Sequence, residues 1–465
     1  MTPHPDPSGT ADATGCAGPG CTADATGCAG PGCTADATGS AGPACTAYVA
    51  GRAGAAGTAV VPDGADGTGG AERAGTGGPA PPSVLSGQGK PVRAEAVVDL
   101  NAISANVAAL REHVGGRDLM AVVKADGYGH GIVESAAAAR RGGADWLGVA
   151  LLDEALYLRS RGDRGPILSW LAVPGERYAD AIAADVEVAA YSVEQLAEIA
   201  AAARHTGGRA RVQLKVDSGL GRGGAHPDDW PALVEEAAHQ ESHGAVEVTG
   251  VWSHLACSDE PEHPSVRAQA SQFEAAVQCA RDGGLDPQHI HLANSGGVLN
   301  LPGTWFTMVR PGIVVYGISP MADGSSTVPV TAAMTLRVTV ALTKRVRAGQ
   351  GVSYGHTYVT DRDTTLALIP LGYGDGIPRH ASGRGPVLVG GERFTVAGRV
   401  CMDQFVLDVG DTDVRAGEAA VVFGDARRGE PTAHEWAAAA DTIGYEIVTR
   451  LGSRVPRRYV GGDGT

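Results

Sequence analysis

Lys124 has the sequence surroundings expected of a lysine whose amine reacts with a carbonyl group. It follows a short apolar run, residues 119–123, and precedes a glycine-rich turn. The run is typical of a buried parallel strand, so the lysine should lie at the strand's carboxyl end, inside a cleft. Poor solvation there disfavours the ammonium form and frees the neutral amine, which a Schiff-base lysine requires. An isolated lysine at a strand end more often extends its ammonium group to water, so this interpretation needs support from neighbouring segments.

Polar side chains follow four later strand-like segments in the same way. They are Lys215 with Arg222, His254, Ser295 and Arg310; after Arg310, Gly312 and Ile313 add backbone N–H groups. Each set alone is weak evidence, since a single histidine such as His254 is more often a satisfied core residue. In an eight-stranded α/β barrel, however, the carboxyl ends of all strands meet at one rim, where catalytic groups gather. Five sets on one rim predict an active site, with phosphate held after the last two strands.

The elements that must position these residues alternate between strand and helix. Strand candidates begin near residues 119, 146, 167, 186, 212, 246, 289 and 306. Amphipathic helices are expected over residues 101–114, 153–161, 192–204 and 264–282. Alternation of this kind indicates a parallel sheet, and eight repeats indicate a closed (β/α)8 barrel over residues 92–328.

After residue 328 the pattern changes to short β-branched runs separated by glycine turns. The runs cover residues 334–346, 364–369, 386–389, 394–409 and 419–423, and one helix is expected over 434–451. Such a pattern predicts a mostly antiparallel β domain over residues 329–461. The predicted fold class is therefore α/β, with a barrel followed by a β domain.

The first 91 residues have a different composition. A twelve-residue unit, TADATGCAGPGC, begins at Thr10, returns at Thr22 and decays after Thr34. The units carry no large apolar residue, so a disordered extension is expected rather than a solenoid. The repeat cysteines do not have the spacing of a zinc site and no histidine lies among them, so no metal is predicted. A start of translation nearer residues 84–92 is an alternative expectation.

Charge and hydropathy exclude several classes of function. The formal net charge is −15, which argues against a nucleic-acid backbone as the main partner. No apolar stretch is long enough to span a bilayer and no secretion signal precedes the domains, so a cytoplasmic protein without membrane contact is expected. Cys257, Cys279 and Cys401 are then expected to be free thiols.

The segment AVVKADGYGHG, residues 121–131, closely resembles the pyridoxal-phosphate lysine motif of alanine racemases. The resemblance continues from about residue 94 to about residue 460, and includes VSYGHTY, LGYGDG, GRVCMDQ and TIGYE in the second domain. It implies that Lys124 carries pyridoxal 5′-phosphate. The residues implied to hold the cofactor phosphate are Tyr128, Ser295, Gly312, Ile313 and Tyr445.

The same resemblance implies roles for the remaining candidates. Arg310 would face the pyridine nitrogen with support from His254, and Arg222 would approach the substrate carboxylate. Lys215 matches a lysine that is carbamylated in many members. Tyr354 matches the second catalytic base and Met402 a substrate contact, and both reach the pocket from the partner subunit of a homodimer.

The implied activity is the interconversion of L- and D-alanine by two bases, supplying D-alanine for peptidoglycan. Two alternatives share the cofactor: a racemase of broader amino-acid or serine specificity, and a decarboxylase on a similar scaffold. Decarboxylation needs no second base, so the Tyr354 segment disfavours it. A third alternative is a pyridoxal-phosphate carrier without catalysis, but such carriers resemble only the barrel and lack the domain of residues 329–461.

Overall fold

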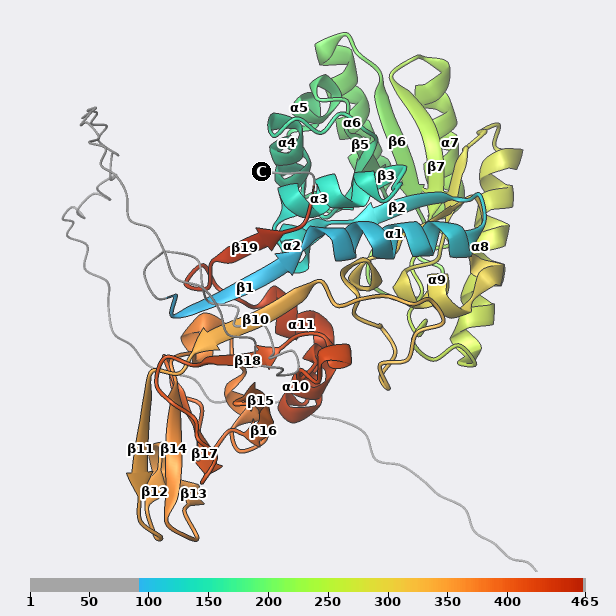
Figure 1. Cartoon of the computed structure of the whole chain (residues 1–465). Coiled ribbons are helices and arrows are strands. Elements are labelled where there is room, and N and C mark those ends of the chain that lie inside the picture. The colour runs from blue at the N-terminus through green and yellow to red at the C-terminus, as the bar shows by residue number, and fades with distance from the viewer. Residues whose placement is uncertain (1–91, 463–465) are drawn as a thin grey trace, which may run out of the picture. The chain divides into compact units, whose positions relative to one another are not determined.

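The computed structural model describes residues 92–462 (Figure 1). The predictions made for residues 1–91, which concern the disordered extension, its repeats and cysteines, and the absence of a metal there, lie outside the described residues. Between residues 92 and 462, no helix combines the length and apolar character needed to cross a bilayer.

Eight parallel strands form the first domain. They are β2 (Asp118–Val122), β3 (Trp146–Val149), β4 (Ile167–Ser169), β5 (Glu187–Ala190), β6 (Ala210–Lys215), β7 (Val246–Trp252), β8 (His289–His291) and β9 (Met308–Val309). Neighbours pair in chain order from β2 to β8, and β9 pairs with β2. Two backbone hydrogen bonds join the remaining ends, from Arg310 to Ala293 at 3.0 Å and from Thr307 to Ile290 at 3.1 Å. The predicted eight-stranded barrel is confirmed.

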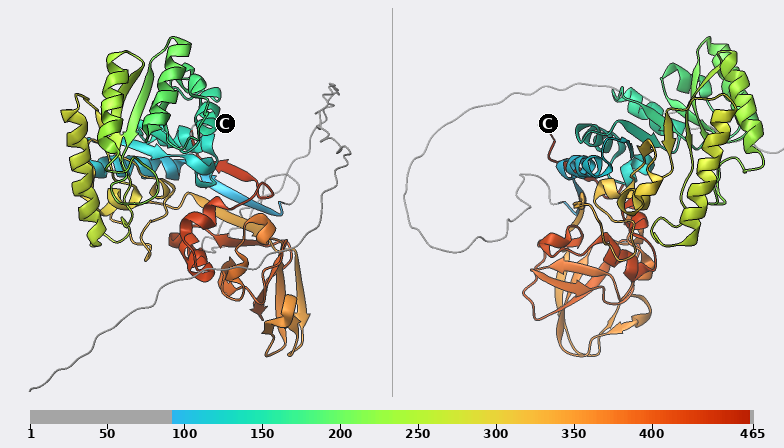
Figure 2. Two further views of the ribbon diagram at one scale, coloured as in Figure 1. Left: turned by 180° about the vertical axis from the view of Figure 1, so that it is seen from behind. Right: turned by 90° about the vertical axis from the view of Figure 1, so that its right-hand side faces the viewer.

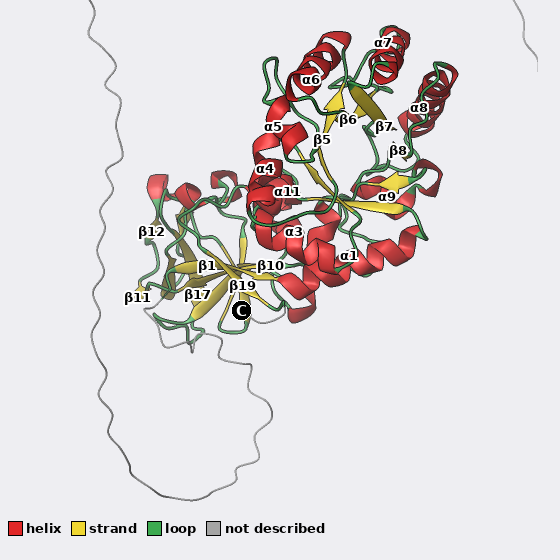
Figure 3. Ribbon diagram, turned by 90° about the horizontal axis from the view of Figure 1, so that it is seen from above, coloured by secondary structure: helices red, strands yellow, loops and turns green. Residues whose placement is uncertain are grey.

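Helices cover the outside of these strands (Figure 2, Figure 3). They are α1 (Leu100–Val114), α3 (Ile132–Arg141), α4 (Leu152–Ser160), α5 (Tyr178–Ala183), α6 (Val193–Thr206), α7 (Trp230–Ser242), α8 (Pro264–Asp282) and α9 (Ser295–Asn300). Helix α1 begins where the Asp99 carboxylate accepts the N–H groups of Asn101 and Ala102, and ends at Gly115, whose φ is 58°. Capping at both ends accounts for the agreement of its bounds with the prediction.

The second domain is mostly antiparallel, as predicted. Its larger sheet has the order β16-β15-β18-β10-β1-β19 and its smaller sheet the order β11-β14-β17. The strands are β1 (Ala94–Asp99), β10 (Met334–Thr339), β11 (Leu342–Val346), β14 (Thr364–Ile369), β15 (Pro386–Val389), β16 (Glu392–Thr395), β17 (Phe405–Gly410), β18 (Ala419–Phe423) and β19 (Arg457–Val460). A separate hairpin pairs β12 (Gly351–Val352) with β13 (Tyr358–Val359).

Two boundaries differ from the expectation. The barrel was expected to include everything from residue 92, but β1 lies between β10 and β19 in the second domain's sheet. An apolar run predicts a strand without naming its partners, which explains the difference. The single helix expected over residues 434–451 is two helices, α10 (Ala433–Ala440) and α11 (Gly444–Thr449). They separate at Asp441, whose left-handed φ of 54° ends α10.

Candidate active site

The predicted polar sets lie where the barrel strands end. Lys124 follows β2 by two residues, Lys215 is the last residue of β6, and His254 lies two residues beyond β7. Ser295 opens α9 after β8, and Arg310 directly follows β9. Because the strands are parallel, these residues share one rim of the barrel.

The segment after Lys124 is a left-handed turn, α2 (Lys124–Tyr128). The φ values of Ala125, Asp126 and Tyr128 are 52°, 54° and 52°. Each such residue costs about 1–2 kcal/mol in a chain of L-amino acids, so the surroundings must hold the turn in place. The Glu154 carboxylate accepts the Ala125 N–H at 2.7 Å, and the Asp126 carboxylate accepts the N–H of the first residue of α3 at 2.9 Å. The Tyr128 ring at the end of the turn is buried and lies 5.2 Å from the ring of Tyr316.

Four cationic side chains influence one another at this rim. Burial, followed by the nearby Arg222, lowers the pKa of Lys124 below its ordinary value. Burial, followed by Arg310 and Arg222, lowers the pKa of Lys215 to about 8. The Lys215 ammonium lies 4.6 Å from the centre of the Trp252 ring, which also borders Arg310 at 4.9 Å. Such a concentration of positive charge favours an anionic ligand and a neutral lysine.

Arg310 is buried and held by neighbours on several strands. It donates to the Ser253 carbonyl at 2.7 Å, to His291 Nδ1 at 2.9 Å and to His254 Nδ1 at 3.3 Å. Burial lowers its pKa to about 9, so the guanidinium remains charged at neutral pH. The pKa of His254 lies well below its ordinary value because of burial and the adjacent Arg310, which keeps His254 neutral and able to accept.

Hydroxyl and backbone groups form a small cradle beside this cluster. The Gly312 N–H donates to Ser295 Oγ at 2.8 Å, and a Cβ on Gly312 would lie only 2.4 Å from the Tyr128 hydroxyl oxygen. The Tyr445 ring, from α11, is 6.2 Å from that of Tyr128, and Ile313 is fully buried next to Gly312. Burial raises the pKa of both tyrosines, so their hydroxyls stay protonated and can donate. The cradle and the neighbouring cations fit a phosphorylated cofactor that reacts with a lysine.

Tyr354 and Met402 lie in the second domain and face outward. Tyr354 begins the short helical turn η3 (Tyr354–His356) between β12 and β13, and its side chain is 71% exposed. Met402 lies between β16 and β17 and is 53% exposed. Within residues 92–462, neither side chain forms a hydrogen bond to a barrel residue. One chain therefore does not complete the predicted set of site residues through such contacts.

Several residues that support the rim were not among the predicted ones. Asp217 accepts four backbone N–H groups, from residues 219 to 222, and so shapes the loop that carries Arg222. Glu154 fixes the Lys124 turn, and His291 contacts Arg310 from inside the barrel. Of these, only His291 lies inside a strand, and a polar residue there does not indicate which residue it contacts. Asp217 lies in the loop after β6 and Glu154 in α4, where polar residues are common.

Comparison with known proteins places both domains in one family. Residues 98–320 match the family model described as alanine racemase, N-terminal domain, and residues 333–459 match alanine racemase, C-terminal domain. An alanine racemase of Frankia casuarinae is 55% identical over 377 residues, which cover 80% of this chain and 97% of the relative. One from Thermobifida fusca is 53% identical, with 79% and 98% covered.

Solved structures agree with the sequence comparisons. The crystal structure of alanine racemase from D-cycloserine-producing Streptomyces lavendulae matches with a TM-score of 0.79 and 53% identity, covering 80% of this chain and 98% of that one. Alanine racemase from Streptomyces coelicolor matches with a TM-score of 0.78 and 51% identity, covering 80% and 99%. With nearly the whole length of these relatives matched, the chain belongs to the alanine racemase family.

Proposed function

We propose that this chain interconverts L-alanine and D-alanine with pyridoxal 5′-phosphate as cofactor. The observation that carries the proposal is Lys124, an amine of lowered pKa at the barrel rim beside a cradle of hydroxyl groups. The racemases named above support the reaction, and dependence on pyridoxal phosphate is general in their family. The proposed role is the supply of D-alanine for peptidoglycan, in the cytoplasm.

In this proposal Lys124 binds the cofactor covalently, and the cradle holds its phosphate. The cradle residues are Tyr128, Ser295, Gly312, Ile313 and Tyr445. When bound, the cofactor supplies a ring that delocalises the negative charge left on Cα after proton removal. Arg310 would face the ring nitrogen, where a guanidinium that is charged at neutral pH donates and cannot accept a proton. It would thereby limit how strongly the ring withdraws electrons, which would favour racemisation over transamination.

Two bases serve opposite faces of the substrate. Lys124 holds the proton on one face and Tyr354 on the other. A protonated phenol is a poor base, so Tyr354 needs a nearby cation that favours its anion. Arg222 is the proposed cation, because its exposed side chain is free of ion pairs and hydrogen bonds within residues 92–462. Arg222 also receives the substrate carboxylate.

Tyr354 and Met402 are proposed to act in the site of a second copy of the chain. Both are exposed and belong to the domain without the lysine, so a head-to-tail homodimer would contain two composite sites related by a two-fold axis.

The direct test follows the optical rotation of L-alanine with and without added pyridoxal phosphate. Decay to zero rotation that depends on the cofactor supports the proposal. Parallel assays on serine and lysine separate an alanine racemase from a broader one, and release of CO₂ would identify a decarboxylase instead. Cofactor binding without any reaction would identify a carrier and overturn the assignment.

Composite sites make a specific prediction for mixed dimers. A Lys124→Ala chain and a Tyr354→Phe chain should each have very low activity alone, because each lacks one base. After subunit exchange, a mixed dimer has one site with both substitutions and one intact site. Each mixed dimer should therefore have about half the activity of an unsubstituted dimer, which has two intact sites. Lack of recovery, after mass spectrometry has verified exchange, would mean that each chain completes its own site.

Lys215 is expected to carry a carbamate. At a pKa of about 8, a substantial share of the amine is neutral in mildly alkaline solution and can attack CO₂, forming an N-carboxylate and releasing one proton. The product is an anion that Arg310 and Arg222 stabilise, although the same arginines destabilise the ammonium form. In ¹³C-bicarbonate, a carbamate resonance should appear, strengthen from pH 7 to 8.5 and be absent from Lys215→Arg. An equal signal in that variant would assign the carbamate elsewhere.

A further inference from the structure

A continuous chain of buried hydrogen bonds runs from the active-site rim into the barrel. Arg310 donates to His291 Nδ1 at 2.9 Å, and His291 Nε2 lies 2.7 Å from Gln213 Oε1. Gln213 Nε2 then donates to Glu187 Oε2 at 2.8 Å. Gln213 and His291 are 0% exposed, and Glu187 is 3% exposed. Four residues from four different strands or strand ends are thus joined without access to water.

The residues at the two ends of this hydrogen-bond chain determine which atom donates in each bond. A guanidinium only donates, so His291 Nδ1 must present a lone pair to Arg310. An ionised carboxylate only accepts, so the Gln213 amide must turn its NH₂ to Glu187 and its oxygen to His291. His291 Nε2 therefore carries the proton. Burial and the adjacent Arg310 hold the pKa of His291 well below its ordinary value, consistent with a neutral ring.

A β-bulge in β7 shapes the Glu187 end. Val212 pairs with Val248, but the next residue of β6, Gln213, pairs with Gly250, so Thr249 is left over. The Thr249 hydroxyl donates to Glu187 Oε2 at 2.6 Å. A Cβ at Gly250 would lie 3.1 Å from the Gln213 side chain, so glycine leaves room for the amide. Bulges beside active sites commonly redirect a side chain in this way.

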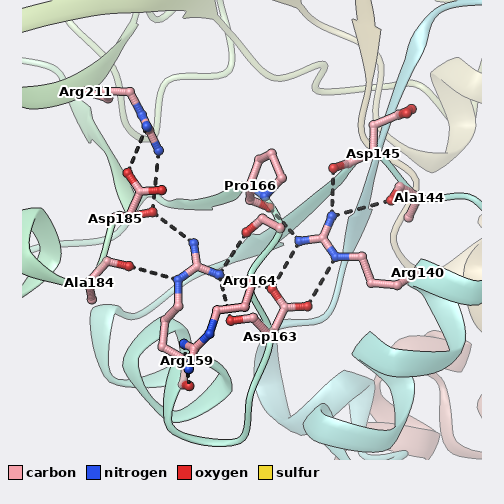
Figure 4. Close-up of polar contacts among 11 residues, drawn as sticks. Arg140, Ala144, Asp145, Arg159, Asp163, Arg164, Pro166, Ala184, Asp185 and Arg211 are labelled. Atoms are coloured by element: carbon pink, nitrogen blue, oxygen red, sulfur yellow. Dashed lines mark hydrogen bonds and ion pairs between the residues drawn. The ribbon is translucent and has the colours of Figure 1, made fainter.

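The other carboxylate oxygen of Glu187, Oε1, is bound by a residue at the end of the barrel that lies opposite the active-site rim. Arg211, near the start of β6, donates to Glu187 Oε1 at 3.0 Å and pairs with Asp185 at 2.8 Å. Asp185 precedes β5, and its carbonyl also accepts from Arg159 at 2.9 Å (Figure 4). Figure 4 also shows Asp163, which pairs with both Arg159 and Arg140. Glu187 is therefore fixed to a rigid part of the scaffold.

We propose that Glu187 is a positioning residue for Arg310, acting through Gln213 and His291 to fix the tautomer that accepts the guanidinium N–H. The inference rests on the proposed function in one respect only, namely that Arg310 faces the cofactor. Among residues 92–462, no carboxylate pairs directly with Arg310. The other side-chain contact of Arg310, to His254, leads to the neutral amide of Asn294 at 3.5 Å, so Glu187 is the anionic end of the chain that begins at His291. Low dielectric strengthens each bond along that chain.

Glu187→Gln tests this with little change in volume. The new amide offers an NH₂ that allows Gln213 to turn over, so that its NH₂ faces His291 Nε2. The His291 proton then moves to Nδ1, where it opposes an Arg310 N–H. Arg211 keeps its Asp185 partner, so the base of the barrel retains one of its ion pairs. Glu247→Gln is the matched control, since Glu247 lies in β7 but has a side chain that is 46% exposed and 3.7 Å from its partner Arg209.

The first measurement needs no cofactor. Long-range ¹H–¹⁵N spectra of apo-protein with labelled histidines report the tautomer, and loss of a signal in His291→Gln assigns His291. In the unsubstituted chain and in Glu247→Gln, His291 should have an unprotonated Nδ1 and a protonated Nε2. In Glu187→Gln, its population should shift toward the tautomer with the proton on Nδ1. A protonated Nδ1 in the unsubstituted chain would overturn the proposal, even if Glu187→Gln failed to fold.

The second measurement titrates each apo-protein with pyridoxal phosphate and follows tryptophan fluorescence. Glu187→Gln should bind the cofactor about tenfold more weakly, the lower end of the loss seen when a residue that supports a metal ligand is replaced, and Glu247→Gln should match the unsubstituted chain. Unchanged tautomer and affinity in a folded Glu187→Gln would overturn the inference. Failure of the unsubstituted chain to bind pyridoxal phosphate would instead count against the proposed function, because the tautomer is read without it.

Discussion

Replacing Lys124 with alanine is expected to abolish racemisation, with a loss of at least about 10⁴-fold. That figure is the upper end for a single acid–base group, and Lys124 is proposed to serve both as a base and as the covalent anchor of the cofactor. The variant should fold, because removing a partly desolvated amine from a cluster of cations relieves repulsion. Circular dichroism of L-alanine solutions measures the loss, and Lys344→Ala, on the exposed strand β11, is the control.

The covalent anchor is open to a separate chemical check. Borohydride reduction of the cofactor-loaded protein should fix pyridoxal phosphate to Lys124, and peptide mapping identifies the labelled residue. The sequence contains only three other lysines, Lys90, Lys215 and Lys344. A label on any of these three, with Lys124 unmodified, would remove the basis of the assignment.

Tyr354→Phe is expected to reduce racemisation by a factor on the order of 10²–10⁴, the usual contribution of one positioned acid–base group. Stability should change by less than about 0.5 kcal/mol, since the substitution removes one hydroxyl from a side chain that is 71% exposed. Cofactor binding should be retained. Tyr157→Phe, an exposed tyrosine on α4, provides a control with the same chemical change outside the site.

Isotope exchange shows which face loses its base in Tyr354→Phe. With Lys124 intact, one enantiomer should still exchange its Cα proton in D₂O, and the other should exchange far more slowly. The family resemblance assigns Lys124 to D-alanine, so deuterium should enter D-alanine faster than L-alanine. Proton NMR of each enantiomer measures the two rates. Equal rates would contradict the two-base assignment and favour one mobile base.

The barrel strands and the residues at their ends were predictable because both depend on local pattern. A buried parallel strand is a short apolar run, and a polar residue after it must lie on the rim. The partners of β1 were not predictable, because an apolar run does not show which strands it will pair with. The break between α10 and α11 was not predictable either, because it depends on Asp441 adopting a left-handed φ. The Glu187 chain was equally hidden, since it needs the bulge that turns Thr249 inward.

The position of β1 has a consequence for how the protein can be made and divided. As the chain leaves the ribosome, β1 is synthesised about 240 residues before β10 and more than 350 before β19, between which it finally lies. One edge of β1 can pair once β10 has been synthesised, but the other edge must wait for β19, so the larger sheet cannot be completed before β19 is made. A fragment starting at residue 333 would lack the strand between β10 and β19. No single cut between the domains therefore yields two pieces with complete sheets.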